Sequence, residues 1–124
     1  MTQEEIVRLV EKWQVKLGLA HWTIDIEFNA DLPSDVKAQI NPLPTRHYAT
    51  ISFPKGVTED NEVELDIIHE LTHLHLCRIH ETIERMCSWQ SREFQDIIDE
   101  EVRNKIELAT DAISTAIYNF AESK

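Results

Sequence analysis

Two histidines stand four residues apart in the segment IIHELTHLHL, residues 67–76, and a glutamate follows the first of them. Positions four apart lie on one face of an α-helix, one turn above each other, so His69 and His73 can hold one metal ion between their imidazoles. Glu70 is rotated by about 100° from His69 and flanks that ion, where it can take a proton from a water molecule. The pattern therefore predicts a site for one Zn²⁺ per chain, with Glu70 as the catalytic base.

The same histidines have a simpler interpretation. Apolar residues lie on both sides of the predicted helix, which indicates that the helix is buried on both sides. Buried histidines need polar partners, and hydrogen bonds to other side chains would satisfy them as well as a metal ion would. The H-E-x-x-H pattern also arises by chance. Its position in the middle of a helix that follows a predicted sheet favours the metal.

A catalytic zinc site usually has a third protein ligand and one open position. The C-terminal helix offers several carboxylates. Glu101 lies at the edge of that helix's apolar stripe and is the one best placed to point inward, whereas Glu100 and Glu107 lie on its polar face. We therefore predict Glu101 as the third ligand. The alternatives are Glu100 first, and then Glu93, Glu107 or water.

Other potential ligands near the motif fit less well. His80 is seven residues past His73, about 10 Å along the helix axis, so it cannot share an ion with His69 on one straight helix. His80 either lines the cleft or lies on the surface. His75 points to another side of the helix, and Cys77 more often acts as a small buried apolar side chain than as a ligand. The oxyanion-stabilising residue stays open among His47, Tyr48 and His80.

The surrounding sequence predicts the elements that hold this site. Thr2-x-x-Glu5 has the form of a capping box and starts a helix that runs to about residue 17. Alternating apolar residues predict strands at 21–30 and 47–54, with a weaker one at 36–40 that is broken by the prolines of 41–46. Helical spacing predicts two further helices. They cover about 60–84 and about 91–121. The order of helix, three strands and two helices predicts a single α+β domain over residues 1–124, with the sheet order around 36–47 left open.

The composition narrows the functional classes. The net charge is −11 with no basic stripe, so we expect no binding to nucleic acid. The acidity is either a solvated surface or a docking face for a basic partner. No apolar run approaches the roughly 20 residues that span a bilayer, and two cysteines do not form a disulfide framework. We therefore expect no membrane partner and a cytoplasmic location. The oligomeric state stays open.

With these residues in hand, the chain resembles the zincin metallopeptidases, and within them the gluzincins, in which a glutamate on a later helix is the third ligand. The likeness is to small phage-type, ImmA-like minimal zincins and extends from about residue 22 to 112. It is carried by WTIDIEF, YATISF, IIHELTHLHL and EEVRNKIELA. The resemblance implies zinc on His69, His73 and Glu101 with Glu70 as base. It further implies that the strand near 48–53 is an edge strand that pairs with an extended peptide.

Two functions follow from this reasoning. The first is a zinc metallopeptidase that hydrolyses a peptide or protein substrate. The second is a catalytically weak or inactive zincin-fold binding module with structural zinc, such as a phage protein that acts on a host protein. Glu70 distinguishes them, because a structural H-x-x-x-H site needs no carboxylate there. A Glu70 held in a salt bridge to Lys or Arg would favour the binding module.

Overall fold

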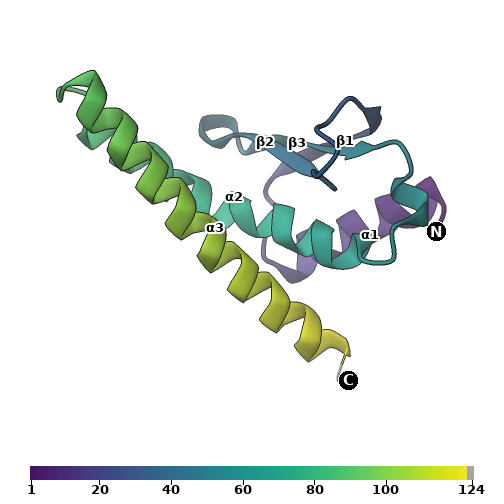
Figure 1. The fold of residues 1–124 in the computed structure, drawn as a ribbon. Coiled ribbons are helices and arrows are strands. Elements are labelled where there is room, and N and C mark those ends of the chain that lie inside the picture. The colour runs from purple at the N-terminus through teal and green to yellow at the C-terminus, as the bar shows by residue number, and fades with distance from the viewer. Residues whose placement is uncertain (123–124) are drawn as a thin grey trace.

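The computed structural model describes residues 1–122 and has an α+β architecture. In chain order it contains one helix, three strands and two helices, which confirms the predicted fold class and element order. The bounds are α1 Gln3–Lys16, β1 Thr23–Ala30, β2 Gln39–Leu43, β3 Tyr48–Pro54, α2 Val63–Met86 and α3 Arg92–Glu122, with 3-10 turns at Pro44–Arg46 and Val57–Glu59. Figure 1 shows the sheet on one side of α2, and α3 running diagonally along α2 so that the tip of their hairpin projects beyond the sheet.

Helix α1 begins at the predicted capping box. The Glu5 N–H donates to the Thr2 hydroxyl at 3.1 Å, and the Thr2 N–H donates to the Glu5 carboxylate at 3.3 Å. The helix ends just before Gly18, whose φ of 73° is a left-handed conformation that glycine adopts without steric cost. The Trp13 indole N–H donates to the Glu64 carboxylate at 2.8 Å and ties α1 to the first turn of α2.

The sheet has the strand order β1-β3-β2, so β3 is its central strand. β1 pairs with β3 in parallel, and β2 pairs with β3 in antiparallel orientation. The side chains of Ala49, Ile51 and Phe53 on β3 are fully buried, because both neighbours and a covering helix enclose this strand. β2 is consequently the edge strand that lies beside α2 and α3.

The second strand differs from its prediction. β2 covers Gln39–Leu43, whereas the alternation of residues 36–40 placed it earlier and the prolines of 41–46 were expected to break it. Pro42 lies within the strand. An edge strand tolerates proline because the missing N–H can face the free edge instead of the ladder.

The hydrophobic core lies between α1, the sheet and one face of α2. Apolar side chains that are almost fully excluded from solvent form it, and they come from α1, β3, α2 and the segments that connect these elements, while β1 and β2 contribute partly buried side chains. They are Ile6, Val10, Trp13, Leu19, Trp22, Ala49, Ile51, Phe53, Val57, Val63, Ile67, Ile68, Leu71 and Leu74. Near the end of α3, Ile117, Tyr118 and Ala121 are partly buried against this core, and burial of these apolar side chains stabilises the fold.

Helices α2 and α3 form an antiparallel hairpin. The Ser91 hydroxyl accepts from the Phe94 N–H at 3.2 Å and caps the start of α3. Within residues 1–122, the fully buried side chains of α3 are Thr110 and Ser114, whereas Ile113 of its expected apolar stripe stays 42% exposed. α3 thus turns a more polar side to α2 than its periodicity predicted. No helix in the part of the chain that the structure describes combines the length and apolar character needed to cross a bilayer.

Candidate metal centre

Helix α2 carries its core-forming side chains and the two histidines of the motif on different faces. Ile67, Ile68, Leu71 and Leu74 are buried against the core, while the two histidines of the motif contact carboxylates of α3. Thr72, inside the motif, is buried and donates its hydroxyl to a backbone carbonyl one turn earlier, at 2.7 Å. The apolar residues on both sides of the motif therefore fix the helix, and the histidines are presented on its remaining face.

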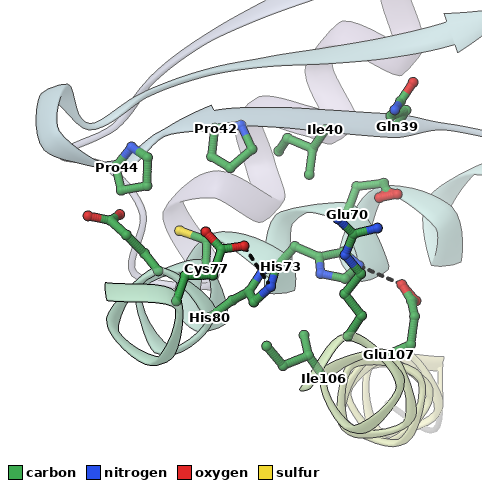
Figure 2. Close-up of a pocket in the computed structure, with 13 residues that line it drawn as sticks. Gln39, Ile40, Pro42, Pro44, Glu70, His73, Cys77, His80, Ile106 and Glu107 are labelled. Carbon is green, nitrogen blue, oxygen red and sulfur yellow. Dashed lines mark hydrogen bonds and ion pairs between the residues drawn. The ribbon is translucent and has the colours of Figure 1, made fainter. Parts of the chain in front are cut away.

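Both histidines contact the same carboxylate of α3. His73 Nε2 lies 2.9 Å from Glu107 Oε1, and His69 Nε2 lies 3.4 Å from the same oxygen (Figure 2 shows the His73 contact). His69 Nδ1 lies 3.0 Å from Asp111 Oδ1. Glu107 and Asp111 are four residues apart, as are the two histidines, so the antiparallel helices bring one carboxylate to each histidine. These contacts bring the Glu107 carboxylate within reach of both imidazoles.

The carboxylate that contacts both histidines is Glu107 rather than Glu101. Glu101 does not lie against the histidines; its exposed side chain borders a groove on another side of the α2–α3 hairpin. Glu101 is six residues before Glu107, which is about 9 Å along the axis and about 120° around it. The prediction assumed that the apolar stripe of α3 faces the site, but the polar side faces it. Glu107, which the sequence reasoning ranked among the lesser alternatives, takes the predicted place of Glu101.

The donor set suits zinc. Two imidazoles and one carboxylate are ligands that Zn²⁺ takes in catalytic sites. Ligand atoms from His69, Glu70 and His73 lie within 4.8 Å of one another, and so do those from His69, Glu107 and Asp111. A carboxylate on the far nitrogen of a histidine fixes the tautomer that leaves Nε2 free to bind a metal, and Asp111 has this position at His69. Burial is the main influence that lowers the pKa of His73, which favours the neutral imidazole that a metal requires.

Glu70 is a buried polar group of the site with an unsatisfied oxygen, as is Asp66 beside it. Its Oε2 atom is buried and has no hydrogen-bond partner. Burial, followed by the charges of Glu107 and Asp66, raises the pKa of Glu70 to about 8. Within residues 1–122 no lysine or arginine forms an ion pair with it. Burying a carboxylate without a cation costs free energy. The surrounding fold, and not a contact of its own, therefore keeps the Glu70 side chain in this position.

A cleft crosses the site between the edge strand and the helix hairpin. One cavity of about 440 Å³ is lined by β2 and by His73, and a second of about 370 Å³ is lined by His69 and Asp111. Glu70 and Glu107 line both cavities, so the two meet at the candidate metal centre. Figure 2 shows β2 above the first cavity, with Gln39, Ile40 and Pro42 along it and Pro44 in the turn that follows.

This arrangement corrects the expectation that the strand near residues 48–53 is the open edge. β3 has a neighbour on each side and offers no free edge to a peptide. The free edge beside the histidines belongs to β2, which the weak alternation of its sequence had left uncertain.

The other residues considered in the sequence lie in varied places. His80 lines the cleft and contacts Asp99 at 2.5 Å and Glu84 at 3.1 Å. Arg103, which the sequence reasoning did not consider, lines the same cavity and pairs with Asp99 at 3.1 Å. Cys77 is partly buried at the cleft wall, and burial raises the pKa of its thiol.

Three residues lie away from the cleft. The Tyr48 hydroxyl donates a short hydrogen bond to Asp25 on the neighbouring strand. His47 contacts Arg78 at 2.9 Å, and His75 contacts the Leu17 carbonyl at the end of α1, at 2.6 Å. Of the three candidates for stabilising an oxyanion, the structure therefore brings only His80 to the cleft.

Comparison of the chain with protein-family models, curated proteins and solved structures found no match. Any functional assignment rests on the site itself.

Proposed function

We propose that this protein is a zinc-dependent peptidase that hydrolyses peptide bonds in a peptide or protein substrate. One zinc ion per chain would be held by His69, His73 and Glu107, with Glu70 as the general base. Asp111 orients His69 through its Nδ1 atom.

The observation that carries this proposal is the state of Glu70. Contacts of the two histidines with Glu107 fit a metal site, and they equally fit core histidines satisfied by side-chain hydrogen bonds. Glu70 favours the first interpretation. Its buried Oε2 lacks a partner and its pKa is raised to about 8, which is costly for a purely structural residue. Perturbed carboxylates in clefts are typical of catalytic groups.

When bound, a zinc ion at these ligands would act as a Lewis acid, making a water molecule nucleophilic near neutral pH and polarising the scissile carbonyl. The residues of the chain supply the remaining chemistry. Glu70 accepts the proton of the attacking water and delivers it to the departing amine. His80 and Arg103 line the same cavity and can donate hydrogen bonds to the substrate's backbone or terminal groups.

The edge strand supports an extended peptide as substrate. In an antiparallel ladder successive residues present their backbone groups alternately to the partner and to the free edge. With the Pro42 nitrogen at the free edge, the N–H and C=O of Ile40 and the C=O of Pro42 face outward beside the cleft. These groups can bind a peptide by strand addition.

A binding module with structural zinc is the less favoured alternative, because Glu70 makes no salt bridge to Lys or Arg within residues 1–122. We also propose a cytoplasmic location, since both cysteines are free thiols, as is usual in reducing compartments.

The first test measures bound zinc per chain by elemental analysis after zinc reconstitution and removal of excess metal. Wild type should hold about one zinc, as expected for a mononuclear site. His73→Ala and Glu107→Gln should hold much less, and Glu101→Gln is the matched control that should retain zinc. Zinc lost with Glu101→Gln but kept with Glu107→Gln would restore the original prediction. No zinc in wild type would overturn the metal site.

The second test measures hydrolysis of a mixed peptide library by mass spectrometry. Zinc-loaded wild type should produce cleavage products, and Glu70→Gln should bind zinc equally but cleave at least about 100-fold more slowly, which is the usual size of a general-base contribution. Zinc binding without any cleavage by wild type, or equal cleavage by Glu70→Gln, would contradict the peptidase proposal and favour the binding module.

A further inference from the structure

Helix α3 carries a row of side chains that belong neither to the hydrophobic core nor to the candidate metal centre. Its members alternate at spacings of four and three residues, which keeps them on one face of the helix. They are Phe94, Ile98, Glu101, Lys105, Leu108, Ala112 and Thr115. This outer seam lies on a different face from Arg103, Glu107, Thr110 and Ser114, which face α2 and the cleft. α3 therefore has two faces with apolar side chains, one that packs on α2 and one that forms the outer seam.

Most of the outer seam is exposed to solvent, and Ile98 is a half-buried member that also lines a cavity between α2 and α3. Leu108 is 63% exposed and Phe94 is 41% exposed, and the adjacent Ile97 is 62% exposed. Beside the seam lies a groove of about 360 Å³ between α2 and α3, lined mainly by apolar side chains. They are Leu76, Ile79, Ile83, Val102, Ile106 and Ala109, together with Glu101 and Lys105. A continuous apolar surface of this kind on a folded chain indicates an interaction site.

The charges of the outer seam point to its partner. Glu101 and Lys105 are its only charged members, and no hydrogen bond or ion pair engages either of them within residues 1–122. If a second α3 lies antiparallel about a two-fold axis at the level of residue 103, Glu101 faces Lys105 of the partner subunit. The same symmetry places Leu108 opposite Ile98 of the partner subunit. A parallel pair would instead set Glu101 against its own copy and Lys105 against its own copy, which is repulsive.

We propose that two copies of this chain associate through the outer seams of their α3 helices, in antiparallel orientation, to form a dimer with a core of four helices. The seam is neutral in charge and self-complementary, although each chain carries a net charge of −11. The metal centre faces another side of α3, so the dimer leaves the cleft open. This proposal is independent of zinc binding and of peptidase activity.

The test is sedimentation equilibrium, supported by light scattering, at physiological ionic strength, where repulsion between the acidic surfaces is screened within about 8 Å. Wild type should have twice the 14.5 kDa mass of the chain. Leu108→Glu should make it monomeric, while circular dichroism should show an unchanged fold because Leu108 is 63% exposed. Glu100→Lys is a control on the polar face of α3 with the same change in charge as Glu101→Lys, and it should remain dimeric.

The charge pair tests the orientation. Glu101→Lys should weaken the dimer by about tenfold or more, because it places two like charges together at the centre of the seam. The double variant Glu101→Lys with Lys105→Glu should restore the dimer. A wild-type monomer at concentrations up to about 100 µM, well above the dissociation constants of specific dimers, would overturn the proposal and assign the seam to a different protein. A dimer that resists Leu108→Glu, or one that the double variant fails to restore, would overturn the interface or its orientation.

Discussion

Replacing Glu70 by glutamine should stabilise the metal-free protein, and the gain should depend on pH. The pKa of Glu70 is raised from 4.5 to about 8 in the folded chain. A group whose pKa is raised by folding contributes stability below its unfolded pKa, and this contribution is lost as the pH rises toward the folded pKa. Glu70 is therefore tolerated when protonated and increasingly destabilising from about pH 4.5 to about pH 8.

The size of the effect follows from the interval between the two pKa values. Each pH unit within it changes the free energy of unfolding by about 1.36 kcal/mol, so the change from about pH 5 to about pH 7.5 is about 3 kcal/mol. Glutamine has nearly the same shape and does not titrate. The difference in stability between Glu70→Gln and wild type should thus grow by about 3 kcal/mol across this range, in favour of the variant.

Urea denaturation in the presence of a chelator, followed by circular dichroism at several pH values, measures this difference. Other titrating groups are common to both proteins and cancel. Glu100→Gln serves as the matched control, because the Glu100 side chain is exposed, and its difference from wild type should not vary with pH. If the difference for Glu70→Gln also stays constant between about pH 5 and about pH 7.5, Glu70 reaches solvent and the argument from its burial is refuted.

Three further predictions concern the neighbours of the site. Asp111→Asn should weaken zinc binding by about 10- to 100-fold in a competition titration with a chelating dye, because Asp111 orients His69 without binding the metal. Asp66→Asn should raise the unfolding free energy of the metal-free protein more at pH 8 than at pH 5, since burial and the neighbouring Asp60 raise the pKa of Asp66 to about 7. Leu71→Ala should lower the unfolding free energy by about 2–5 kcal/mol in urea, as Leu71 is fully buried, and a loss below about 1 kcal/mol would contradict its place in the core.

The fold was largely predictable because its signals are local. The capping box at Thr2 and Glu5, the alternation in β1 and the helical spacing of α2 each reflect contacts within a few residues. The edge strand was displaced in the prediction because Pro42 reads as a strand breaker, and only the sheet order reveals that its N–H has no ladder partner to lose. Local patterns predict elements well and their neighbours poorly.

The candidate site likewise has a part that local sequence patterns predict and a part that depends on long-range packing. His69, Glu70 and His73 lie within five residues, so helix geometry alone predicts how they face one another. The third carboxylate depends on how α3 is rotated against α2, which is a long-range property. Both faces of α3 carry apolar residues, and the periodicity of the sequence cannot tell which face meets α2. A usable signal was present, since Glu107 and Asp111 repeat the spacing of the two histidines on the helix that runs back along α2.

The rotation of α3 also explains how one helix pair can combine a polar site with a stable fold. The core lies on the side of α2 that carries Ile67 and Leu71, and only the end of α3, at Ile117, Tyr118 and Ala121, packs against it. Glu70 is therefore buried on a face of α2 that contributes little apolar packing to the core. The polar side of α3 supplies the carboxylates that contact the histidines of this face. Turning the apolar stripe of α3 toward the histidines would bury more hydrophobic surface, but it would remove Glu107 and Asp111 from them. The observed rotation leaves Ile113 of that stripe and Leu108 of the outer seam exposed to solvent, so the arrangement that brings the carboxylates to the candidate metal centre also leaves apolar side chains of α3 at the surface.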